Sequence, residues 1–350
     1  MTAGDENENE NSGRRLRTRL DSVSRRQFLG ATGAGIVTLG GARAVHNTLL
    51  GYGHFGMGTN LLEQDLQPLF EARLSLEYTG DVDSVHVEVD AEDGYVAARN
   101  DGADETVAFD GHTAADARAV DDRFGLDGVV ESLFEDVTAF RADEHTFEFL
   151  DVEQFFERVD EGVLRPHLVA AARGWGDGRA DPDLVEAFTN VDPTDTEALV
   201  YGLKRGFREH GQYDVPRYVA GSIEDNVIFG ATDLRRHFED SVEFESLLEN
   251  DGTGLFCWEL VHRSMEAFHA VPPWKQTVPV AAVYVSDRRH KHAYTGLVTA
   301  IRDDGALRIP VTFIDYTYST LYDDFRLTRL RGQGLDAYDG MHRADEVYWA

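Results

Sequence analysis

The chain has 350 residues, with 64 Asp and Glu against 33 Lys and Arg, which gives a formal net charge of −31 at pH 7. Hydrophobic residues make up 42% and aromatic residues 11%, so the composition is that of a folded globular protein and not of a disordered acidic tail. Because phosphate groups are bound by clustered Lys and Arg, this charge balance argues against nucleic acid or an anionic membrane as a partner.

Lysine is scarce in this chain: Lys204, Lys275 and Lys291 are the three lysines, and all other basic residues are arginines. An acidic, lysine-poor chain of this kind looks like a halophilic protein, since concentrated salt screens like charges and acidic groups keep the surface hydrated. We therefore interpret the acidity as an adaptation to habitat. The single cysteine, Cys257, excludes an internal disulfide and a thiolate-based zinc cluster.

The N-terminal stretch 24–29, Ser-Arg-Arg-Gln-Phe-Leu, resembles a twin-arginine export signal. Residues 27–42 carry no charge, and Ala42-Arg43-Ala44 offers small residues for cleavage after Ala44. We expect residues 1–44 to be a signal peptide and the protein to be extracellular or at the cell surface. The translocation machinery is then a partner, and membrane contact is transient or through an uncleaved signal. The uncharged run is short for a spanning helix, which needs about 20 apolar residues. A basic patch before a short core helix is the other interpretation.

Residues 45–150 are expected to form a small β-rich region. Between 71 and 110 apolar residues alternate with period two: Leu74, Leu76 and Tyr78 precede a turn at Gly80-Asp81, and the pattern resumes at Val85. This alternation predicts a small antiparallel sheet. Residues 111–150 give no firm prediction.

Residues 151–350 are expected to form a second, α+β domain. An apolar stripe from Val152 to Leu164 predicts a helix, and further helices are predicted to open at Asp181-Pro182, at Thr194 with capping-box spacing, at Thr232 and near Cys257. Strands are then predicted over residues 278–285, 293–301 and 307–314, with a turn at 303–305. The fold class we expect is α+β, with a helical segment packed on an antiparallel sheet.

Three residues near these elements form a candidate catalytic group. Cys257 opens a helix, whose N-terminus favours a thiolate; His292 opens a strand; Asp315 ends the next strand. If the two strands pair about the turn, His292 and Asp315 lie directly opposite each other. A four-residue loop over 303–306 moves the register by two and keeps both on one face, whereas a three-residue loop or a bulge separates them.

This order of residues resembles the transglutaminase-like branch of the papain-type cysteine enzymes, over roughly residues 230–320. The resemblance depends on Cys257 at a helix start, on His292-Ala293-Tyr294 and on Asp315-Tyr316-Thr317. It implies that Cys257 is the nucleophile, His292 the base and Asp315 the group that orients the base. The stretch 271–274, Val-Pro-Pro-Trp, departs from the family's usual sequence after the cysteine helix, which leaves a non-catalytic relative as an alternative.

A metal site is the competing interpretation of the same region. His290 and His292 share strand parity, so His290 is both a competing base and a possible second ligand. No convincing third ligand follows from the sequence, because Asp287 has the opposite parity and is expected in the preceding turn. We therefore expect no metal and no cofactor.

The expected function is that of an exported cysteine-dependent acyl-transfer enzyme, a peptide or amide hydrolase with a Cys–His–Asp triad and a peptide or protein substrate. The alternative is a cell-surface binding or structural protein that keeps the transglutaminase-like core without its chemistry. In that case the β-rich residues 71–110 are the expected binding region.

Overall fold

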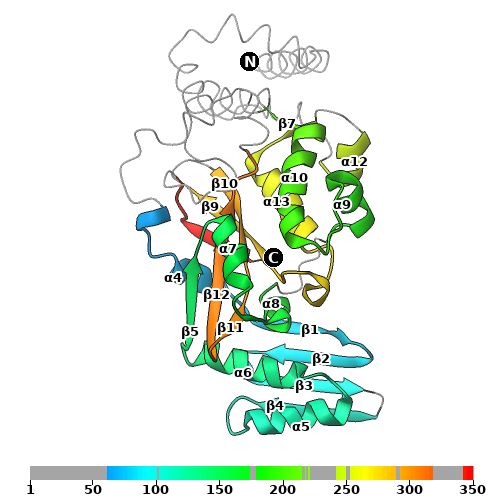
Figure 1. Ribbon diagram of the computed structural model, residues 1–350, viewed down its shortest axis with the longest axis vertical. Coiled ribbons are helices and arrows are strands. Elements are labelled where there is room, and N and C mark those ends of the chain that lie inside the picture. The colour runs from blue at the N-terminus through cyan, green and yellow to red at the C-terminus, as the bar shows by residue number, and fades with distance from the viewer. Residues whose placement is uncertain are drawn as a thin grey trace, which may run out of the picture.

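The computed structural model describes residues 61–100, 102–173, 179–214, 217, 220, 242–249, 253–288, 292–317 and 342–349 (Figure 1). The expected signal peptide, the helix start at Thr232 and His290 lie outside these residues. Within the described ranges, no helix combines the length and apolarity needed to cross a bilayer. The fold is mixed α+β, as expected, and its sheets are mainly antiparallel.

A four-stranded antiparallel sheet forms one end of the molecule, in the order β1-β2-β3-β4 (Figure 1). The small sheet predicted from the period-two pattern is therefore confirmed. The prediction of a turn at Gly80-Asp81 is wrong, because β1 runs through both residues. Val82 pairs directly with Val85, so the chain turns between them, at Asp83, whose φ is +54°. The elements here are β1 Glu77–Val82, β2 Val85–Asp90, β3 Tyr95–Asn100, β4 Ala103–Ala108, α5 Ala114–Phe124 and α6 Val129–Arg141.

The larger sheet has seven strands in the order β13-β9-β10-β12-β11-β6, with β5 pairing parallel to β12. The boundary expected at residue 150 does not coincide with a boundary between the two sheets. Strand β5 ends at Phe149, before that boundary, and belongs to the seven-stranded sheet. The strands are β5 His145–Phe149, β6 Val163–Leu164, β9 Ala281–Asp287, β10 His292–Val298, β11 Ile301–Asp303, β12 Ala306–Ile314 and β13 Glu346–Tyr348.

The register of the central hairpin follows from its turn. Asp304 and Gly305 form a two-residue turn with φ of +48° and +82°, as in the turns that suit the twist of antiparallel strands. The same offset continues along β10 and β12, where Thr295 pairs with Ile314. The prediction that His292 and Asp315 lie directly opposite each other is therefore wrong. The register is shifted by two residues, which keeps both side chains on one face, as the alternative loop predicted.

Helices cover the two faces of the seven-stranded sheet. The helix expected from Val152 to Leu164 ends earlier, and Val163 and Leu164 form β6. Asp181 caps α9 as predicted, whereas Asp195, and not Thr194, accepts the capping hydrogen bond at the start of α10. The helices are α4 Gln67–Glu71, α7 Val152–Val159, α8 Pro166–Arg173, α9 Pro182–Thr189, α10 Thr196–His210, α12 Phe244–Glu249 and α13 Cys257–Phe268. The short strands β7 Gly211–Tyr213 and β8 Thr253–Leu255 pair in parallel before α13.

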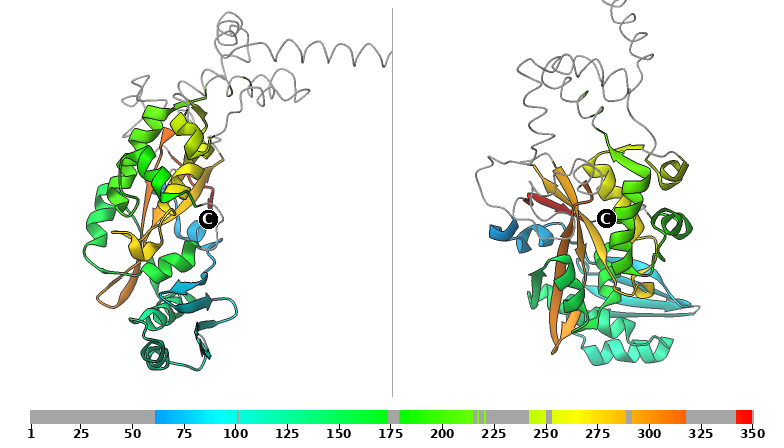
Figure 2. Two further views of the ribbon diagram at one scale, coloured as in Figure 1. Left: turned by 90° about the vertical axis from the view of Figure 1, so that its right-hand side faces the viewer. Right: turned by 45° about the horizontal axis from the view of Figure 1, so that its top comes forward.

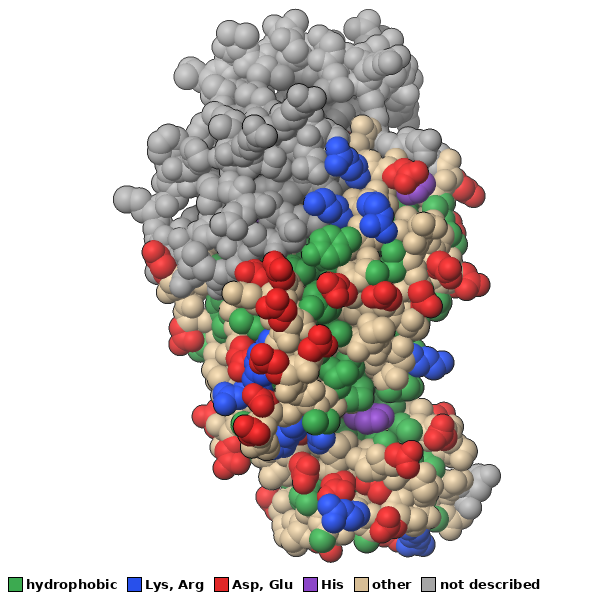
Figure 3. Space-filling view, in the orientation of Figure 1, with side chains coloured by type: hydrophobic (Ala, Val, Ile, Leu, Met, Phe, Trp, Pro, Cys, Tyr) green, Lys and Arg blue, Asp and Glu red, His purple; other side chains and the backbone are tan. Residues whose placement is uncertain are grey.

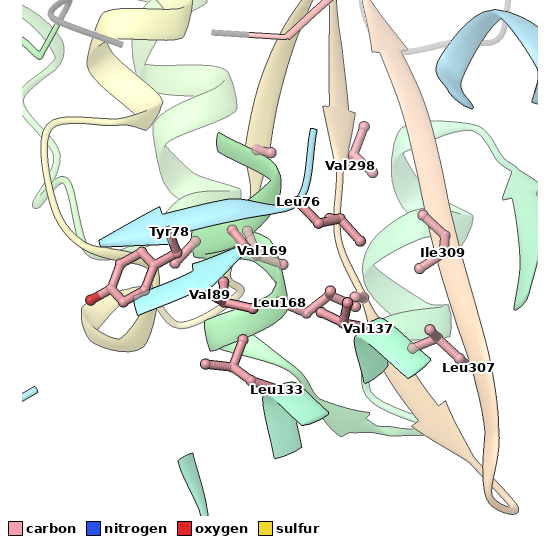
Figure 4. Packing of buried hydrophobic residues seen from close by; sticks show 14 of the residues in the cluster. Leu76, Tyr78, Val89, Leu133, Val137, Leu168, Val169, Val298, Leu307 and Ile309 are labelled. Carbon is pink, nitrogen blue, oxygen red and sulfur yellow. The ribbon is translucent and has the colours of Figure 1, made fainter. Parts of the chain in front are cut away.

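Helices lie on both faces of the seven-stranded sheet (Figure 2). Side chains of the sheet contribute to two apolar clusters, one on each face. On one face α4, α6, α8 and the four-stranded sheet pack together, as the neighbouring side chains of Leu76, Leu168, Val298 and Ile309 show in Figure 4. On the other face lie α7, α9, α10, α12 and α13. The acidic side chains are scattered over the surface seen in Figure 3, as expected for a solvated acidic exterior.

A buried arginine fixes the C-terminal end of α13 to the sheet. Arg173, at the end of α8, is 3% exposed. Its guanidinium donates to the carbonyl oxygens of Phe268, Val271 and Val280, at 3.2, 2.9 and 2.7 Å, and to Gln276 Oε1. One side chain therefore joins the end of α13, the following loop and the start of β9.

We expect Arg173→Ala to lower the free energy of unfolding by about 3 kcal/mol or more, because several buried carbonyl oxygens lose a charged donor at once. Urea unfolding followed by circular dichroism measures this change. The matched control is Arg118→Ala, which removes an exposed guanidinium paired with Glu131 and should leave the free energy of unfolding nearly unchanged. Equal effects of the two substitutions would contradict the anchoring role of Arg173.

Candidate active site

Cys257 is the first residue of α13, which packs against β10 through a 2.6 Å hydrogen bond between Ser264 Oγ and Thr295 Oγ1. The backbone N–H groups in a helix's first turn have no intrahelical partner and favour negative charge nearby. The thiol is half-buried and not sealed in the core. The position of Cys257 at the helix start is therefore confirmed.

The start of α13 is held by buried charges. The carboxylate of Glu259 accepts the N–H of Phe256 at 2.6 Å, and it pairs with Arg217 Nη1 at 2.7 Å. The guanidinium of Arg217 also lies 4.5 Å from the ring centroid of Phe256. These contacts define the direction in which the helix N-terminus, and with it Cys257, points.

His292 and Asp315 meet at the same end of the sheet. His292 Nε2 lies 2.8 Å from Asp315 Oδ2, and the two residues are only 4% and 5% exposed. The thiol of Cys257 lies close enough to this imidazole to raise its pKa. The three residues singled out in the sequence therefore lie together, with the thiol near the imidazole and the imidazole hydrogen-bonded to the carboxylate.

The hydrogen bonds define the proton positions on His292. An ionised carboxylate only accepts, so Nε2 carries the proton that Asp315 binds. This leaves Nδ1 as the ring nitrogen for Cys257. The imidazole can therefore accept a proton from the thiol or donate one toward it, while Asp315 holds the ring.

A second histidine, His342, was not expected at this site. Its Nε2 lies 3.0 Å from the same oxygen, Asp315 Oδ2, and the residue is 6% exposed. The other oxygen, Oδ1, accepts the N–H of Thr317 at 2.9 Å. His342 belongs to no short motif and comes 27 residues after Asp315, so only the folded chain reveals it.

The electrostatics of the pair follow from burial and contact. Burial lowers the pKa of His292, but the charge of Asp315, the hydrogen bond that the ring donates to it and the nearby thiol of Cys257 outweigh burial and raise the pKa to about 10. Burial acts to raise the pKa of Asp315, but the two imidazoles together hold it far below its ordinary range. The favoured state at neutral pH is imidazolium beside carboxylate.

Asp287 is placed differently from the sequence expectation. It is the last residue of β9 and pairs directly with His292 across the ladder, instead of lying in a turn. Asp287 is 1% exposed, and its Oδ2 accepts the N–H of Arg343 at 3.2 Å. The strand continues further than its hydropathy suggests because this acid is paired inside the fold.

His292, Asp315 and His342 are also the residues that could hold a metal ion, since one ligand atom of each lies within 4.8 Å of the others. Ligands placed tetrahedrally at about 2.1 Å from zinc would lie about 3.4 Å apart. The observed contacts of 2.8 and 3.0 Å fit direct hydrogen bonds better. The arrangement is therefore that of a hydrogen-bonded group of side chains.

A second group with ligand atoms in range lies apart from this site, at Glu71, Asp143 and His145. His145 Nε2 lies 3.0 Å from Glu71 Oε1, and the His145 ring stacks on Phe140 with centroids 4.0 Å apart. Asp143 is exposed at the surface. The stacking and the acid contact engage the ring and Nε2, whereas Nδ1 is buried without a hydrogen-bond partner among the described residues.

Comparisons of the chain with protein-family models, curated proteins and solved structures found no match. The function of the site must therefore follow from its geometry and chemistry.

The pKa of His292 predicts the pH at which any activity that needs the imidazolium declines on the alkaline side. The facing groups are Asp315, His342, Cys257 and Asp287. Because the pKa of His292 is raised, we expect kcat/KM to stay constant as the pH rises above neutral and to fall only near pH 10.

In Asp315→Asn the carboxylate charge is lost and burial remains, so the alkaline limb should move toward the ordinary imidazole pKa of about 6.5 or lower. A pH profile of kcat/KM over pH 5–11 measures the limb in both proteins. An unchanged limb in the variant would show that Asp315 does not set the charge of His292.

Proposed function

We propose that the protein is a cysteine-dependent acyl-transfer enzyme that hydrolyses peptide or amide bonds. The observation that supports this most is the grouping of the partly buried Cys257 near His292, which is itself hydrogen-bonded to the buried carboxylate of Asp315. A thiol nucleophile needs a group that favours the thiolate, a base for its proton and an orienting acceptor, and this chain offers all three.

In the acylation step, the sulfur of Cys257 attacks the carbonyl carbon of the substrate and forms a C–S bond. The proton taken up by His292 passes from Nδ1 to the nitrogen of the leaving amine as the C–N bond breaks. Asp315 keeps the imidazolium in place and balances its charge. The backbone N–H of Cys257, at the first helical position, is a suitable donor to the developing oxyanion.

In the second step, water attacks the thioester, with His292 accepting its proton and returning it to the sulfur. The C–S bond breaks, a carboxylic acid is released and the thiol is restored. An amine in place of water would give transfer instead of hydrolysis. We propose hydrolysis as the main reaction, because lysine acceptors are scarce in acidic proteins such as this one.

An aromatic surface lies beside the thiol. Trp258 is 41% exposed, and its ring lies 6.0 Å from that of His262, which in turn lies 5.6 Å from Tyr284. Burial, and then the charge of Cys257, raise the pKa of Tyr284 to about 12, which indicates that this phenol lies near the sulfur. These rings offer a peptide substrate a surface to pack on next to the reactive atom.

The core supports a transglutaminase-like assignment as part of the same proposal. The cysteine helix α13 packs on β9 and β10, and the histidine and aspartate lie at the ends of the neighbouring strands β10 and β12. We also propose that the protein acts outside the cell after twin-arginine export and in concentrated salt. These proposals derive from the sequence motif and the acidic composition.

The alternative, a binding or structural protein with an inert Cys257, requires no contact between thiol and imidazole. The thiol of Cys257 acts on the pKa of His292, and this closeness, with the partly exposed Trp258 beside it, favours the enzyme.

Alkylation by iodoacetamide tests whether the thiol is activated. Near neutral pH we expect Cys257 to react at least about tenfold faster than free cysteine, because the imidazolium and the helix N-terminus favour the thiolate. Mass spectrometry of the alkylated peptide measures the rate. His292→Ala should remove the acceleration.

The matching activity test uses a panel of peptide anilides in concentrated salt. Cys257→Ser should lower kcat by about 10³-fold or more while the melting temperature stays the same, because oxygen replaces the nucleophilic sulfur. A wild-type thiol no more reactive than free cysteine, or a Cys257→Ser variant with full activity, would contradict the proposed function.

Export is tested separately with Arg25→Lys and Arg26→Lys together. The double substitution keeps the charge but removes the arginine pair, so we expect the protein to accumulate inside the cell. Immunoblots of cell and medium fractions report this. The control, Arg17→Lys, lies upstream of the pair and should be exported; equal export of both variants would argue against the twin-arginine route.

A further inference from the structure

We propose that His342 is a positioning residue of this site, so that the working unit is a Cys–His–Asp–His network in place of a triad. The inference rests on the proposed function, because positioning matters only if His292 moves protons. The imidazole of His342 donates to Asp315 Oδ2 at 3.0 Å, beside the 2.8 Å contact from His292. Both rings therefore use one carboxylate oxygen.

Asp315 needs such support because of its place in the chain. The paired part of β12 ends at Ile314, one residue before it. The N–H of Thr317 binds Oδ1, and His292, the ring that Asp315 has to orient, binds Oδ2. The donor from His342 holds Oδ2 independently of that ring. A buried carboxylate with both oxygens engaged stays ionised and keeps one orientation.

His342 is itself firmly held. The N–H of Leu61 donates to its carbonyl oxygen at 2.8 Å, and the next residue accepts the hydroxyl of Tyr294 at its carbonyl oxygen, at 2.9 Å. The Tyr294 ring meets the His342 imidazole edge-on, with centroids 4.9 Å apart. Strand β13, a few residues further on, adds to the edge of β9. The C-terminal segment therefore delivers this imidazole to Asp315 with a defined position.

The geometry separates a positioning role from a role in substrate binding. His342 is 6% exposed, and the contacts of its imidazole join it to Asp315, to the ring of Tyr294 and to the ring of His292, whereas the influence of Cys257 falls on His292. Its removal should therefore change the chemical step and leave substrate binding nearly intact. In kinetic terms, kcat changes and KM does not.

The experiment compares His342→Leu, which removes the donor, with His342→Gln, whose amide can still donate to Oδ2. In His342→Leu we expect kcat for a peptide anilide to fall about 10- to 100-fold with KM nearly unchanged, and Cys257 to be alkylated more slowly at neutral pH. His342→Gln should recover part of both losses. Melting curves confirm that the variants are folded, and His342→Phe replaces the leucine variant if it does not fold.

The control is the exposed pair of His86 and Asp81, in which His86 Nδ1 lies 3.0 Å from Asp81 Oδ1. His86→Leu removes the same kind of contact far from the thiol and should change neither rate. Wild-type values of kcat and alkylation in His342→Leu would overturn the inference, as would equal losses in the leucine and glutamine variants.

Alkylation separates this inference from the proposed function. If the wild type cleaves no amide but alkylates rapidly, and His342→Leu slows that alkylation, the positioning role stands and the hydrolase assignment fails. If the wild type is active and His342→Leu matches it, the hydrolase stands and the positioning role fails.

Discussion

The buried carboxylate of Asp315 is the constraint on which the site depends. Three donors converge on it: the imidazoles of His292 and His342 on one oxygen and the N–H of Thr317 on the other. A carboxylate 5% exposed would be costly without such partners, and an imidazolium 4% exposed would be equally costly without the carboxylate. Each charge therefore makes the other tolerable inside the fold, and the pair is located where the thiol needs it.

The helix that carries the thiol is fixed at both ends by buried arginines. At its start, Arg217 pairs with Glu259, which also accepts the N–H that precedes the helix. At its end, Arg173 binds three carbonyl oxygens of the turn into β9. Because β9 pairs with β10 over seven residues, this connection ties the helix to the strand that begins with His292. The closeness of the Cys257 thiol to the His292 imidazole is thus set by the framework more than by the two side chains themselves.

The sequence predicted those parts of the site that depend on local rules. The start of α13 near Cys257 follows from the sequence Asp251-Gly252-Thr253-Gly254, whose residue types favour a break just before the helix. The shared face of His292 and Asp315 follows from strand parity, although the two-residue turn at Asp304-Gly305 shifts them by two places. His342 could not be predicted, because its place depends on an added edge strand and on contacts with residue 61 and Tyr294. Asp287 was misplaced for a related reason: a polar residue at a strand end gives no hydrophobic signal when its partner is a backbone N–H.

The acidic exterior and the buried site respond to salt in different ways. At a net charge of −31, unscreened surface repulsion would destabilise the compact chain, but the Debye length falls to about 3 Å in 1 M salt. Exposed carboxylates then interact little beyond their nearest neighbours. The contact of 2.8 Å between His292 and Asp315 is shorter than that length and shielded from solvent, so ions in solution screen it weakly. A buried ion pair can therefore keep an imidazole charged in concentrated salt, whereas long-range attraction from surface carboxylates could not. In such salt, the carboxylate of Asp315 is the group that can keep His292 protonated for the proposed chemistry.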